Sequence, residues 1–385
     1  MKHSNKNLLF ISTNAQYGGS EVLWVKMINH MYRSDIEQKF AVIIHPWPKY
    51  PSQIMELEED GLKIYRAKRA TSSIANRVLV KLGVKPQQDF NFFIKKANLS
   101  FKPGLAIVSV GDHTSDDLPI ITDALNESNI PYVILVQLAN EFKDLSDVHA
   151  IHLLKSYSEA KKCFFLCLKN KRIVENHIGG LLYNAELFQS PFNYSVLNEP
   201  SLPYKGESNV YNIGMVTNLN VFHKGHDLIL QVLSAKNWQN RNYRLNIYGT
   251  GNNIELIKRL INIYKLDNKV KLMGYAESPV EIWEFNQACL FVSRMEGQSL
   301  AMIDAISLGR MIITTNVGDA ENLVVDNETG FIINYPESTL ISIVMDKAWE
   351  KRDSWLKMGA EGKARLKTIF KEDPIHKIIN RIKDL

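Results

Sequence analysis

The sequence predicts an α/β protein with two doubly wound parallel sheets, one after the other along the chain. Short apolar runs without polar alternation are separated by amphipathic segments, which is typical of parallel strands covered by helices on both faces. A polar, proline-marked stretch, residues 197–209, interrupts this order, and the same order then begins again. We therefore expect an N-terminal domain over residues 1–196, a linker region over residues 197–209 and a second domain over residues 210–368. Residues 369–385 are expected to form a C-terminal helix that could pack back on the N-terminal domain.

In the first domain, apolar runs of strand length alternate with segments that have the 3.6-residue period of a helix. The opening run, NLLFIST, is the first strand, and SEVLWVKMINHMY is the helix that follows it. Strands are expected at residues 7–13, 39–45, 104–110, 131–138 and 162–168, and helices at residues 20–32, 116–129 and 170–179.

The second domain repeats this alternation, and its last part, from about Pro336, is expected to be helical with charged faces. Its strands are expected at residues 210–216, 243–249, 269–275, 289–294, 311–315 and 330–333, and its helices at residues 224–235, 253–266, 278–288 and 299–309. Ligands of doubly wound sheets bind at the carboxyl ends of the strands. Two such sheets in series predict a ligand cleft between the domains, which can close and exclude water.

The composition is that of a globular protein, with 45% apolar and 23% charged residues among 385. No apolar stretch reaches the roughly 18–20 residues that a membrane span needs, and the opening run is too short for a signal peptide. The three cysteines, Cys163, Cys167 and Cys289, are too few for a disulfide framework and have no histidine cluster beside them. We therefore expect a cytoplasmic protein with buried thiols and no metal site.

The positive charge is concentrated in residues 61–102, where Asp89 is the one acidic residue among many lysines and arginines. Apolar runs such as IANRVLVKLGV and FNFFIKK lie between these basic residues. A basic, partly amphipathic surface suits anionic lipid headgroups or a phosphate-bearing acceptor, so peripheral contact with the inner face of a membrane is one interpretation. A solvated helical face is the other. No recognition motif accompanies the charge, so we do not expect nucleic acid as a partner.

The stretch Ser293–Gly309, SRMEGQSLAMIDAISLG, joins a predicted strand to a predicted helix and carries two carboxylates. A helix that begins near Gln298 or Ser299 would leave free backbone N–H groups at its start, with the positive end of the helix dipole behind them. Such a position favours phosphate or sugar oxygens. The candidate ligand contacts are Glu296, Gly297, Gln298, Ser299, Leu300 and Asp304. Taken alone, the two acidic residues would also suit a loop carboxylate and a solvated helix charge.

Further loops at strand ends add glycines and one lysine. Lys224 lies at the entry to another helix, where it can neutralise a diphosphate as a point charge. Close backbone approach is expected at Gly249, and a strand-to-loop step at Gly274 and Tyr275. Gly18 and Gly19, after the first strand, could approach a phosphate or the sugar being transferred, or could form a tight turn. One more loop carries Gly318 and Glu321.

In this order and spacing, the segments GGSE, KGHDLIL, LNIYGTG, KVKLMGY, SRMEGQSLAMIDAISLG and NVGDAENLVVDNETGFII resemble glycosyltransferase family 4. The resemblance is strongest from about Tyr211 to Ile333, and the N-terminal half matches only loosely. It implies the GT-B fold, with two Rossmann-like domains that face a cleft. It also implies a retaining, nucleotide-sugar-dependent enzyme whose N-terminal half binds the acceptor.

The resemblance assigns roles to particular residues. Glu296 would bind hydroxyls of the donor sugar, with the amides of Gln298, Ser299 and Leu300 nearby. Asp304 would bind the ribose hydroxyls, although the family has glutamate at this position. Lys224 matches the lysine that binds the diphosphate. These roles put Lys224 and Glu296 at the centre of the predicted chemistry, with no metal and no resident cofactor.

Two positions depart from the family pattern. Asn218 stands where the family has an arginine, so one cationic partner of the diphosphate is missing. Gln137 stands where members often have a histidine after the strand PYVILV, and glutamine can hydrogen-bond a sugar hydroxyl but cannot take a proton. His113, in VGDHTSDD, is an alternative cleft histidine.

The function implied by the resemblance is transfer of a sugar from a nucleotide diphosphate donor, expected to be UDP-linked, to a glycan or lipid-linked glycan. Cell-surface polysaccharide synthesis is the expected setting. A non-catalytic member that binds a glycan or a nucleotide is the alternative, because of the changes at Asn218 and Gln137. A sugar-phosphate-processing enzyme of the same fold would need a further acid–base pair, and the sequence offers no evident candidate.

Overall fold

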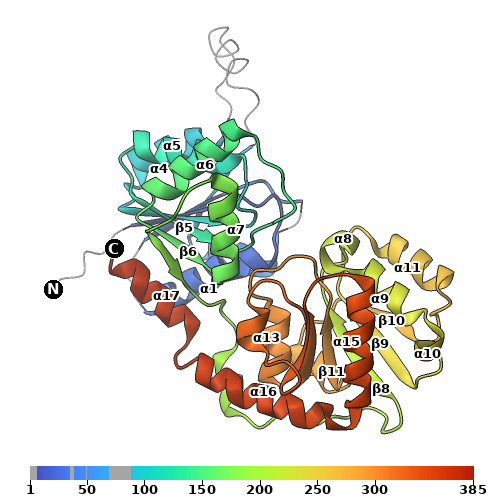
Figure 1. Ribbon diagram of the computed structural model, residues 1–385. Coiled ribbons are helices and arrows are strands. Elements are labelled where there is room, and N and C mark those ends of the chain that lie inside the picture. The colour runs from blue at the N-terminus through green and yellow to red at the C-terminus, as the bar shows by residue number, and fades with distance from the viewer. Residues whose placement is uncertain (1–6, 35–38, 49, 69–87) are drawn as a thin grey trace. The chain divides into compact units, whose positions relative to one another are not determined.

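The computed structural model of the protein describes residues 7–34, 39–48, 50–68 and 88–385 (Figure 1). The chain divides into two compact units, one formed by Met1–Ser190 with Pro374–Leu385 and the other by Pro191–Asp373. Much of the basic stretch predicted at residues 61–102 lies outside the described residues. Within the described parts of the chain, no helix combines the length and the apolar character required to cross a bilayer.

The first unit contains a seven-stranded parallel sheet. Its strands are β1 (Leu8–Ser12), β2 (Phe40–Ile44), β3 (Lys63–Arg66), β4 (Leu105–Val110), β5 (Tyr132–Val136), β6 (Lys162–Phe165) and β7 (Ala185–Leu187). They lie in the order β3-β2-β1-β4-β5-β6-β7. Leu8 of the interior strand β1 pairs with Phe40 on one side and with Leu105 on the other, in parallel register.

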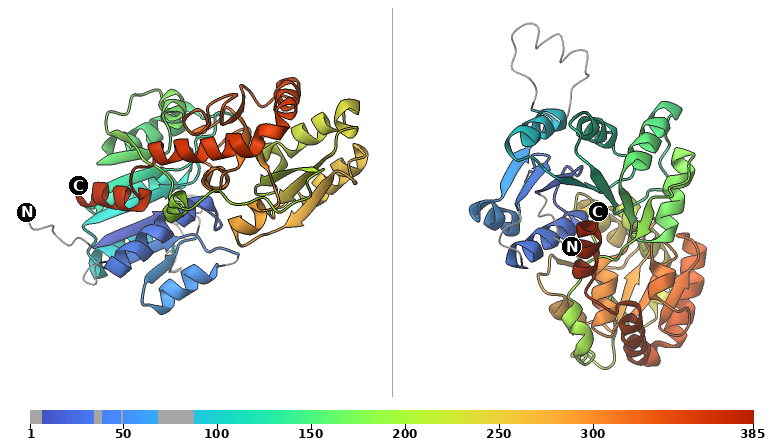
Figure 2. Two further views of the ribbon diagram at one scale, coloured as in Figure 1. Left: turned by 90° about the horizontal axis from the view of Figure 1, so that it is seen from below. Right: turned by 90° about the vertical axis from the view of Figure 1, so that its left-hand side faces the viewer.

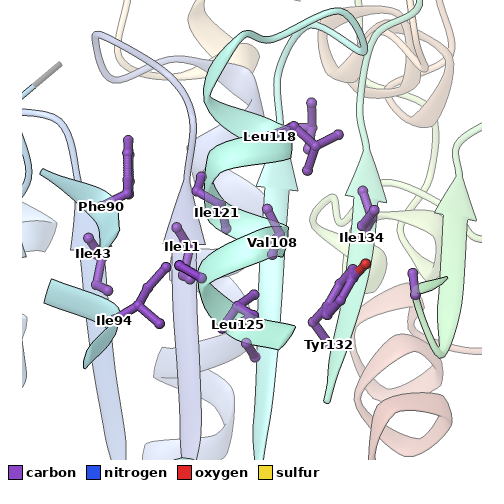
Figure 3. Packing of buried hydrophobic residues seen from close by; sticks show 14 of the residues in the cluster. Ile11, Ile43, Phe90, Ile94, Val108, Leu118, Ile121, Leu125, Tyr132 and Ile134 are labelled. Carbon is purple, nitrogen blue, oxygen red and sulfur yellow. The ribbon is translucent and has the colours of Figure 1, made fainter. Parts of the chain in front are cut away.

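Helices cover both faces of this sheet. They are α1 (Gly19–Ser34), α2 (Ser52–Glu59), α4 (Phe90–Ser100), α5 (Asp117–Glu127), α6 (Asp147–Glu159), α7 (Leu168–Ile178) and α17 (Pro374–Lys383). Successive strand residues point to opposite faces. Ile11 and Val108 therefore pack under α4 and α5, whose Phe90, Ile94 and Ile121 lie over them in Figure 3.

The opposite face of the sheet is covered by α1, α2 and the C-terminal helix α17. Isoleucines at positions 375, 378, 379 and 382 of α17 form one buried stripe at helical spacing, and they pack with α1 into the same core as Phe10. Figure 2 shows α17 beside α1. The rings of His30 on α1 and His376 on α17 are in contact, with their centroids 4.3 Å apart and their planes inclined at 56°. The end of the chain therefore belongs to the core of the first unit.

The second unit contains a six-stranded parallel sheet. Its strands are β8 (Tyr211–Val216), β9 (Tyr243–Tyr248), β10 (Val270–Gly274), β11 (Ala288–Phe291), β12 (Met311–Thr315) and β13 (Gly330–Ile333). They lie in the order β10-β9-β8-β11-β12-β13, with parallel pairing throughout. The prediction of two parallel sheets covered by helices is confirmed.

The second sheet also packs helices on each face. They are α8 (Val221–Lys224), α9 (His226–Leu233), α10 (Lys236–Gln239), α11 (Ile254–Ile263), α12 (Pro279–Trp283), α13 (Leu300–Ser307), α14 (Ala320–Leu323), α15 (Ser338–Glu350) and α16 (Trp355–Ile369). One core joins the sheet to α9, α10, α11 and α15, and the other joins it to α12, α13, α14 and α16 (Figure 1).

The polar stretch at residues 197–209 is packed on the second unit. The amide of Leu202 donates to the carbonyl of Leu308 over 3.0 Å. The buried guanidinium of Arg310 donates to the carbonyls of Trp283 at 2.6 Å and Pro203 at 3.4 Å. Burial lowers the pKa of Arg310 to about 10, yet these carbonyls satisfy the group, and together they fasten the stretch to the sheet domain.

Each sheet has one point at which the strand order reverses. In the first unit this point lies between β1 and β4, and in the second unit it lies between β8 and β11. The loops that leave neighbouring strands diverge there to opposite faces of the sheet, which opens a crevice at the carboxyl ends where doubly wound folds bind ligands.

Candidate functional site

The loops that follow β8 and β11 bring Lys224 and Glu296 together. Lys224 is the last residue of α8, and its Nζ donates to Oε1 of Glu296 over 2.6 Å. The hydroxyl of Ser293 donates to the same carboxylate oxygen over 2.8 Å. The side chains of Lys224 and Glu296 are only 14% and 12% exposed, so the pair is held largely away from water. The two residues predicted to be catalytic therefore meet at the reversal point of the second sheet.

The environment keeps Glu296 ionised. Burial by itself raises the pKa of this carboxyl, but the charge of Lys224 and the hydrogen bonds from Lys224 and Ser293 outweigh it and lower the pKa below its usual value. The neighbouring His223 has a lowered pKa because of burial and because of the charge on Lys224. Its Nε2 lies 2.8 Å from the carbonyl oxygen of Met295, so this nitrogen carries the proton. The centre of the site is thus a compact ion pair beside a neutral imidazole.

Gly225 allows the two loops to approach this closely. It joins α8 to α9 with φ +70°, a conformation that favours glycine, and a Cβ at this position would lie 2.1 Å from the carbonyl oxygen of Val292. Arg294 adds a second connection, because its guanidinium forms two bonds to Asp227, at 3.0 and 2.7 Å, and a third to the carbonyl of Phe222 at 2.8 Å. The segment after β11 is therefore fastened to α8 and α9 directly before Glu296.

The loop from Gly297 to Ser299 leads directly into α13, which begins at Leu300. Ser299 is the N-cap, and its side chain makes no capping hydrogen bond to the first turn. The amides at this helix start are thus without that internal partner and can bind an anion or a sugar oxygen. Asp304 lies on the same helix and is half-buried. The helix begins within two residues of the predicted start near Gln298 or Ser299.

The remaining predicted donor residues lie at the ends of β8, β9 and β10. The amide of Gly249 donates to the carbonyl of Gly274 over 2.7 Å, and a Cβ on Gly249 would lie 1.9 Å from the carbonyl oxygen of Thr217. Asn218 is exposed, and the Tyr275 side chain is 73% exposed. These residues therefore lie at the end of, or shortly after, β8, β9 or β10, which are neighbouring strands of the sheet, and Lys224 also follows β8.

In the first unit, a buried carboxylate organises the turn that contains Gly18 and Gly19. Glu21 accepts hydrogen bonds from the hydroxyls of Ser12 and Ser20, each at 3.0 Å, from the amide of Gly18 at 3.0 Å and from the side chain of Asn14 at 2.6 Å. Burial raises the pKa of Glu21. The Gly18 amide already donates to this carboxylate. To bind a phosphate or the transferred sugar, as predicted, it would first have to give up this hydrogen bond. Gly19 is the exposed first residue of α1.

Gln137 belongs to the same region. Its Nε2 donates to the carbonyl of Ser20 at 2.6 Å and to the hydroxyl of Ser109 at 3.0 Å, so its amide supports the turn after β1. The side chain is mostly buried, and its donor group is occupied within the protein.

His113 does not line a surface, contrary to its selection as an alternative cleft histidine. Its ring is fully buried, and Nε2 lies 2.9 Å from Nδ1 of His177. The amide of Asn140 donates to its Nδ1 over 3.3 Å, and the Tyr157 hydroxyl donates to its carbonyl over 2.8 Å. Both ring nitrogens are taken up inside the protein, by His177 of α7 and by the amide of Asn140, so the ring serves as an internal brace for the loop after β4.

A pocket of about 400 Å³ opens at the reversal point of the first sheet. The loops after β1 and β4 form it, together with the start of α5. Its lining consists of Thr13, Asn14, Ala15, Asp112, Thr114, Ser115, Asp116, Asp117, Ile120 and Lys143. Burial raises the pKa of Asp112, but the nearby ring of His113 and the hydrogen bonds from Thr114 outweigh it and lower the pKa to about 2. Asp117 lies 2.8 Å from Nε2 of His45. The pocket is therefore polar and acidic.

The sequence analysis did not select the residues of this pocket, nor Arg294 and Asp319. The polar run DHTSDD, directly after a buried strand, is the signal in the sequence that points to this pocket. Within the described residues, no three histidine, cysteine, aspartate or glutamate side chains gather closely enough to hold a metal ion.

The family and the relatives that this chain resembles are glycosyltransferases. Residues 210–344 match the model of a family described as glycosyl transferases group 1. The poly(glycerol-phosphate) α-glucosyltransferase of Bacillus subtilis is 26% identical over 195 residues, which cover 49% of this chain and 28% of that enzyme. The matched region thus spans less than a third of that relative. An uncharacterized glycosyltransferase of Methanocaldococcus jannaschii is 24% identical over 332 residues, covering 81% of this chain and 76% of the relative.

Among solved structures, Anabaena HepE in complex with UDP and glucose superposes with a TM-score of 0.75. It is 14% identical to this chain, and the alignment covers 99% of this chain and 100% of HepE. The predicted fold class is confirmed by two parallel-sheet α/β units with GT-B glycosyltransferases as structural neighbours. The matched family and both of these relatives are glycosyltransferases, and the fold of the chain is that of GT-B structural neighbours.

Proposed function

We propose that this protein is a retaining glycosyltransferase that moves a sugar from a UDP-linked donor to a glycan or lipid-linked glycan in cell-surface polysaccharide synthesis. The observation that carries the proposal is the Lys224–Glu296 pair at the reversal point of the second sheet, beside the start of α13. A cation and a helix start suit a diphosphate, and a carboxylate suits sugar hydroxyls.

The pair has a defined part in the proposed reaction. An incoming diphosphate competes with Glu296 for the ammonium group of Lys224. Once released, the Glu296 carboxylate can accept hydrogen bonds from hydroxyls of the donor sugar. The bond between the anomeric carbon and the β-phosphate oxygen then breaks while the acceptor hydroxyl attacks the same face, and the leaving phosphate oxygen takes the acceptor proton. Lys224 and the α13 amides stabilise the charge on the leaving diphosphate, so the proposed reaction needs no metal.

The pocket of the first unit is proposed to hold the acceptor. Its carboxylates can accept hydrogen bonds from hydroxyl groups, whereas they repel phosphate, so an uncharged sugar or polyol end fits its chemistry.

A lipid-linked acceptor would be presented at a membrane surface. Exposed lysines of the described basic stretch, Lys63, Lys68 and Lys96, are suited to anionic lipid headgroups there.

The names of two relatives bear on the transferred sugar and on the stereochemistry. The Bacillus subtilis relative is an α-glucosyltransferase. A Staphylococcus aureus relative, 27% identical over 108 residues, is a poly(ribitol-phosphate) α-N-acetylglucosaminyltransferase. UDP-glucose has an α-linked sugar, so an α-linked product corresponds to retention. For this chain, retention and the uridine donor are part of the proposal.

The test begins with a thermal-shift screen against the diphosphates of uridine, guanosine and adenosine, because a bound ligand raises the melting temperature by mass action. UDP release from UDP-glucose is then measured for the wild type and for Lys224→Ala and Glu296→Ala. The matched controls are Lys258→Ala and Glu255→Ala, an exposed ion pair of the same unit at 2.8 Å. We expect the site variants to lose at least about 100-fold in rate and the controls to keep wild-type activity.

The same experiment separates the alternative of a non-catalytic binding protein. Such a protein would show a thermal shift with UDP but no UDP release from any sugar donor, with or without acceptor. Normal turnover in both site variants would instead show that the Lys224–Glu296 pair is not the catalytic centre.

A further inference from the structure

Two loops of the second unit are joined directly behind the proposed donor site. One is the loop from Glu296 to Ser299 after β11, and the other follows the neighbouring strand β12. The amide of Asp319 donates to the carbonyl of Gly297 over 3.0 Å, and the side-chain amide of Gln298 donates to the Asp319 carboxylate. Backbone and side chain of one residue thus hold two consecutive residues of the donor loop.

Gly318 makes this junction possible. Its φ is +57°, and a Cβ at this position would lie 2.0 Å from the carbonyl oxygen of Gly297 and 2.8 Å from that of Glu296. The two backbones are therefore in direct contact at the residue that carries the proposed sugar-binding carboxylate.

The carboxylate at the junction is buried although a neutral side chain could join the loops. Asp319 and Gln298 are only 9% and 6% exposed. Burial raises the pKa of Asp319 to about 6, against the opposing hydrogen bonds from Gln298 and Asn322. Burying a carboxylate costs free energy unless strong hydrogen bonds offset it. Because Asp319 contacts the donor loop, we relate the free-energy cost of burying its carboxylate to a role in holding that loop.

We propose that Asp319 is a positioning residue of the donor site, which acts through Gln298 and Gly297 to fix the loop that presents Glu296 and the α13 amides. The inference rests on the proposed function, since it requires that this loop binds the donor. A loop held in its bound geometry before the donor arrives loses little conformational entropy on binding. Release of the loop should therefore weaken donor binding more than it slows the chemical step.

The experiment uses the full chain and UDP as the probe. Binding of UDP is measured by calorimetry, and KM and kcat for UDP-glucose are measured by UDP release. The variants are Asp319→Ala, Asp319→Asn, Gln298→Ala and the double variant Asp319→Ala/Gln298→Ala. The matched control is Asp326→Ala, because the exposed Asp326 also accepts a backbone hydrogen bond in this unit, from the amide of Ile332 in β13 over 2.8 Å. Melting temperatures are recorded for all variants.

If Asp319 acts through Gln298, the two alanine variants weaken UDP binding by about tenfold each and the double variant is no worse than either. KM for UDP-glucose rises by the same factor while kcat changes less. Asp319→Asn retains most of the affinity, because an amide oxygen still accepts from Gln298. Asp326→Ala binds UDP like the wild type.

Two results would overturn the inference while leaving the proposed function in place. One is a wild type that binds UDP and an Asp319→Ala variant that binds it equally well while its melting temperature falls, since Asp319 would then serve stability alone. The other is additive losses in the double variant, which would show that Asp319 does not act through Gln298. A wild type that binds no UDP would contradict the proposed function itself.

Discussion

Lys224 and Glu296, which are 72 residues apart in the chain, are joined by a hydrogen bond of 2.6 Å between Nζ and Oε1. In the absence of a donor, each charge is the partner of the other. The pair therefore keeps two largely buried charges compensated until an anionic ligand competes for the lysine. Several measurable consequences follow from this relationship and from the contacts around it.

Substitution of Lys224 by methionine should destabilise the protein most strongly near neutral pH. The buried Glu296 would lose its cation, and we expect a loss of about 2–3 kcal/mol in the free energy of unfolding. In the wild type the pKa of Glu296 is lowered, so its contribution to stability is present above pH 4.5 and is lost on acidification. In the variant, protonation removes an uncompensated charge. The stability difference between the two proteins should therefore shrink as the pH falls from 7 towards 4.

Urea unfolding at a series of pH values measures this effect. Lys258→Met is the control, because Lys258 and its partner Glu255 are 53% and 69% exposed, and we expect a change within about 0.5 kcal/mol. A difference between wild type and Lys224→Met that stays constant over the pH range would argue against electrostatic compensation of Glu296.

Gly225→Ala should be more destabilising than Gly274→Ala. Both glycines have positive φ, +70° and +76°, so an alanine side chain is strained at either position. A Cβ on Gly274 has no atom within 4 Å, whereas a Cβ on Gly225 meets the carbonyl oxygen of Val292 at 2.1 Å. We expect about 1 kcal/mol at Gly274 from backbone strain and several kcal/mol at Gly225. Equal losses would mean that the α8–α9 junction moves freely away from β11.

Burial of His226 should make the protein less stable in mild acid. Burial lowers the pKa of this residue to about 4, whereas the unfolded chain has an ordinary histidine pKa near 6.5. Between pH 7 and pH 4 the unfolded state therefore binds a proton at this histidine and the folded state does not. The free energy of unfolding should fall over this range by on the order of 3 kcal/mol. His226→Asn, which keeps an acceptor for the hydroxyl of Thr217, should show a shallower loss. The free energy of unfolding is measured by urea titration at a series of pH values for the wild type and for His226→Asn. The same pH dependence in both proteins would refute this explanation.

Glu21→Gln should loosen the turn after β1 and with it one wall of the acceptor pocket. The carboxylate accepts from Asn14 and from the Gly18 amide, and a glutamine would point an N–H group at one of these donors. We expect a loss of about 1–3 kcal/mol in stability and a higher KM for the acceptor, with a smaller change for the donor. Glu127→Gln, in an exposed ion pair with Lys95, is the control. An unchanged acceptor KM would separate the Glu21 network from acceptor binding.

The sequence by itself determined most of the strands and helices, although the edge strands β3 and β7 and the helices α2, α4 and α6 were not predicted. A strand that is buried on both faces is a continuous apolar run, and a helix that covers a sheet shows a 3.6-residue period. Both patterns can therefore be recognised within the segment itself. Lys224 and Glu296 were selected because each lies between a predicted strand and the helix that follows it, and because each matches a motif residue of the family that the sequence resembles. Glycines such as Gly249 were recognised from the turn that follows a strand.

Only the tertiary structure decided which of these loops meet. The strand order places β8 next to β11 and so joins Lys224 to Glu296, and it places β1 next to β4 and so forms the pocket that the sequence did not reveal. It also turned His113 inward and brought Asp319 beside Gln298. Local periodicity specifies whether a residue is buried, but its partner depends on contacts between segments distant in the chain. That is why the pairings at each sheet reversal appear only when the whole sheet is assembled.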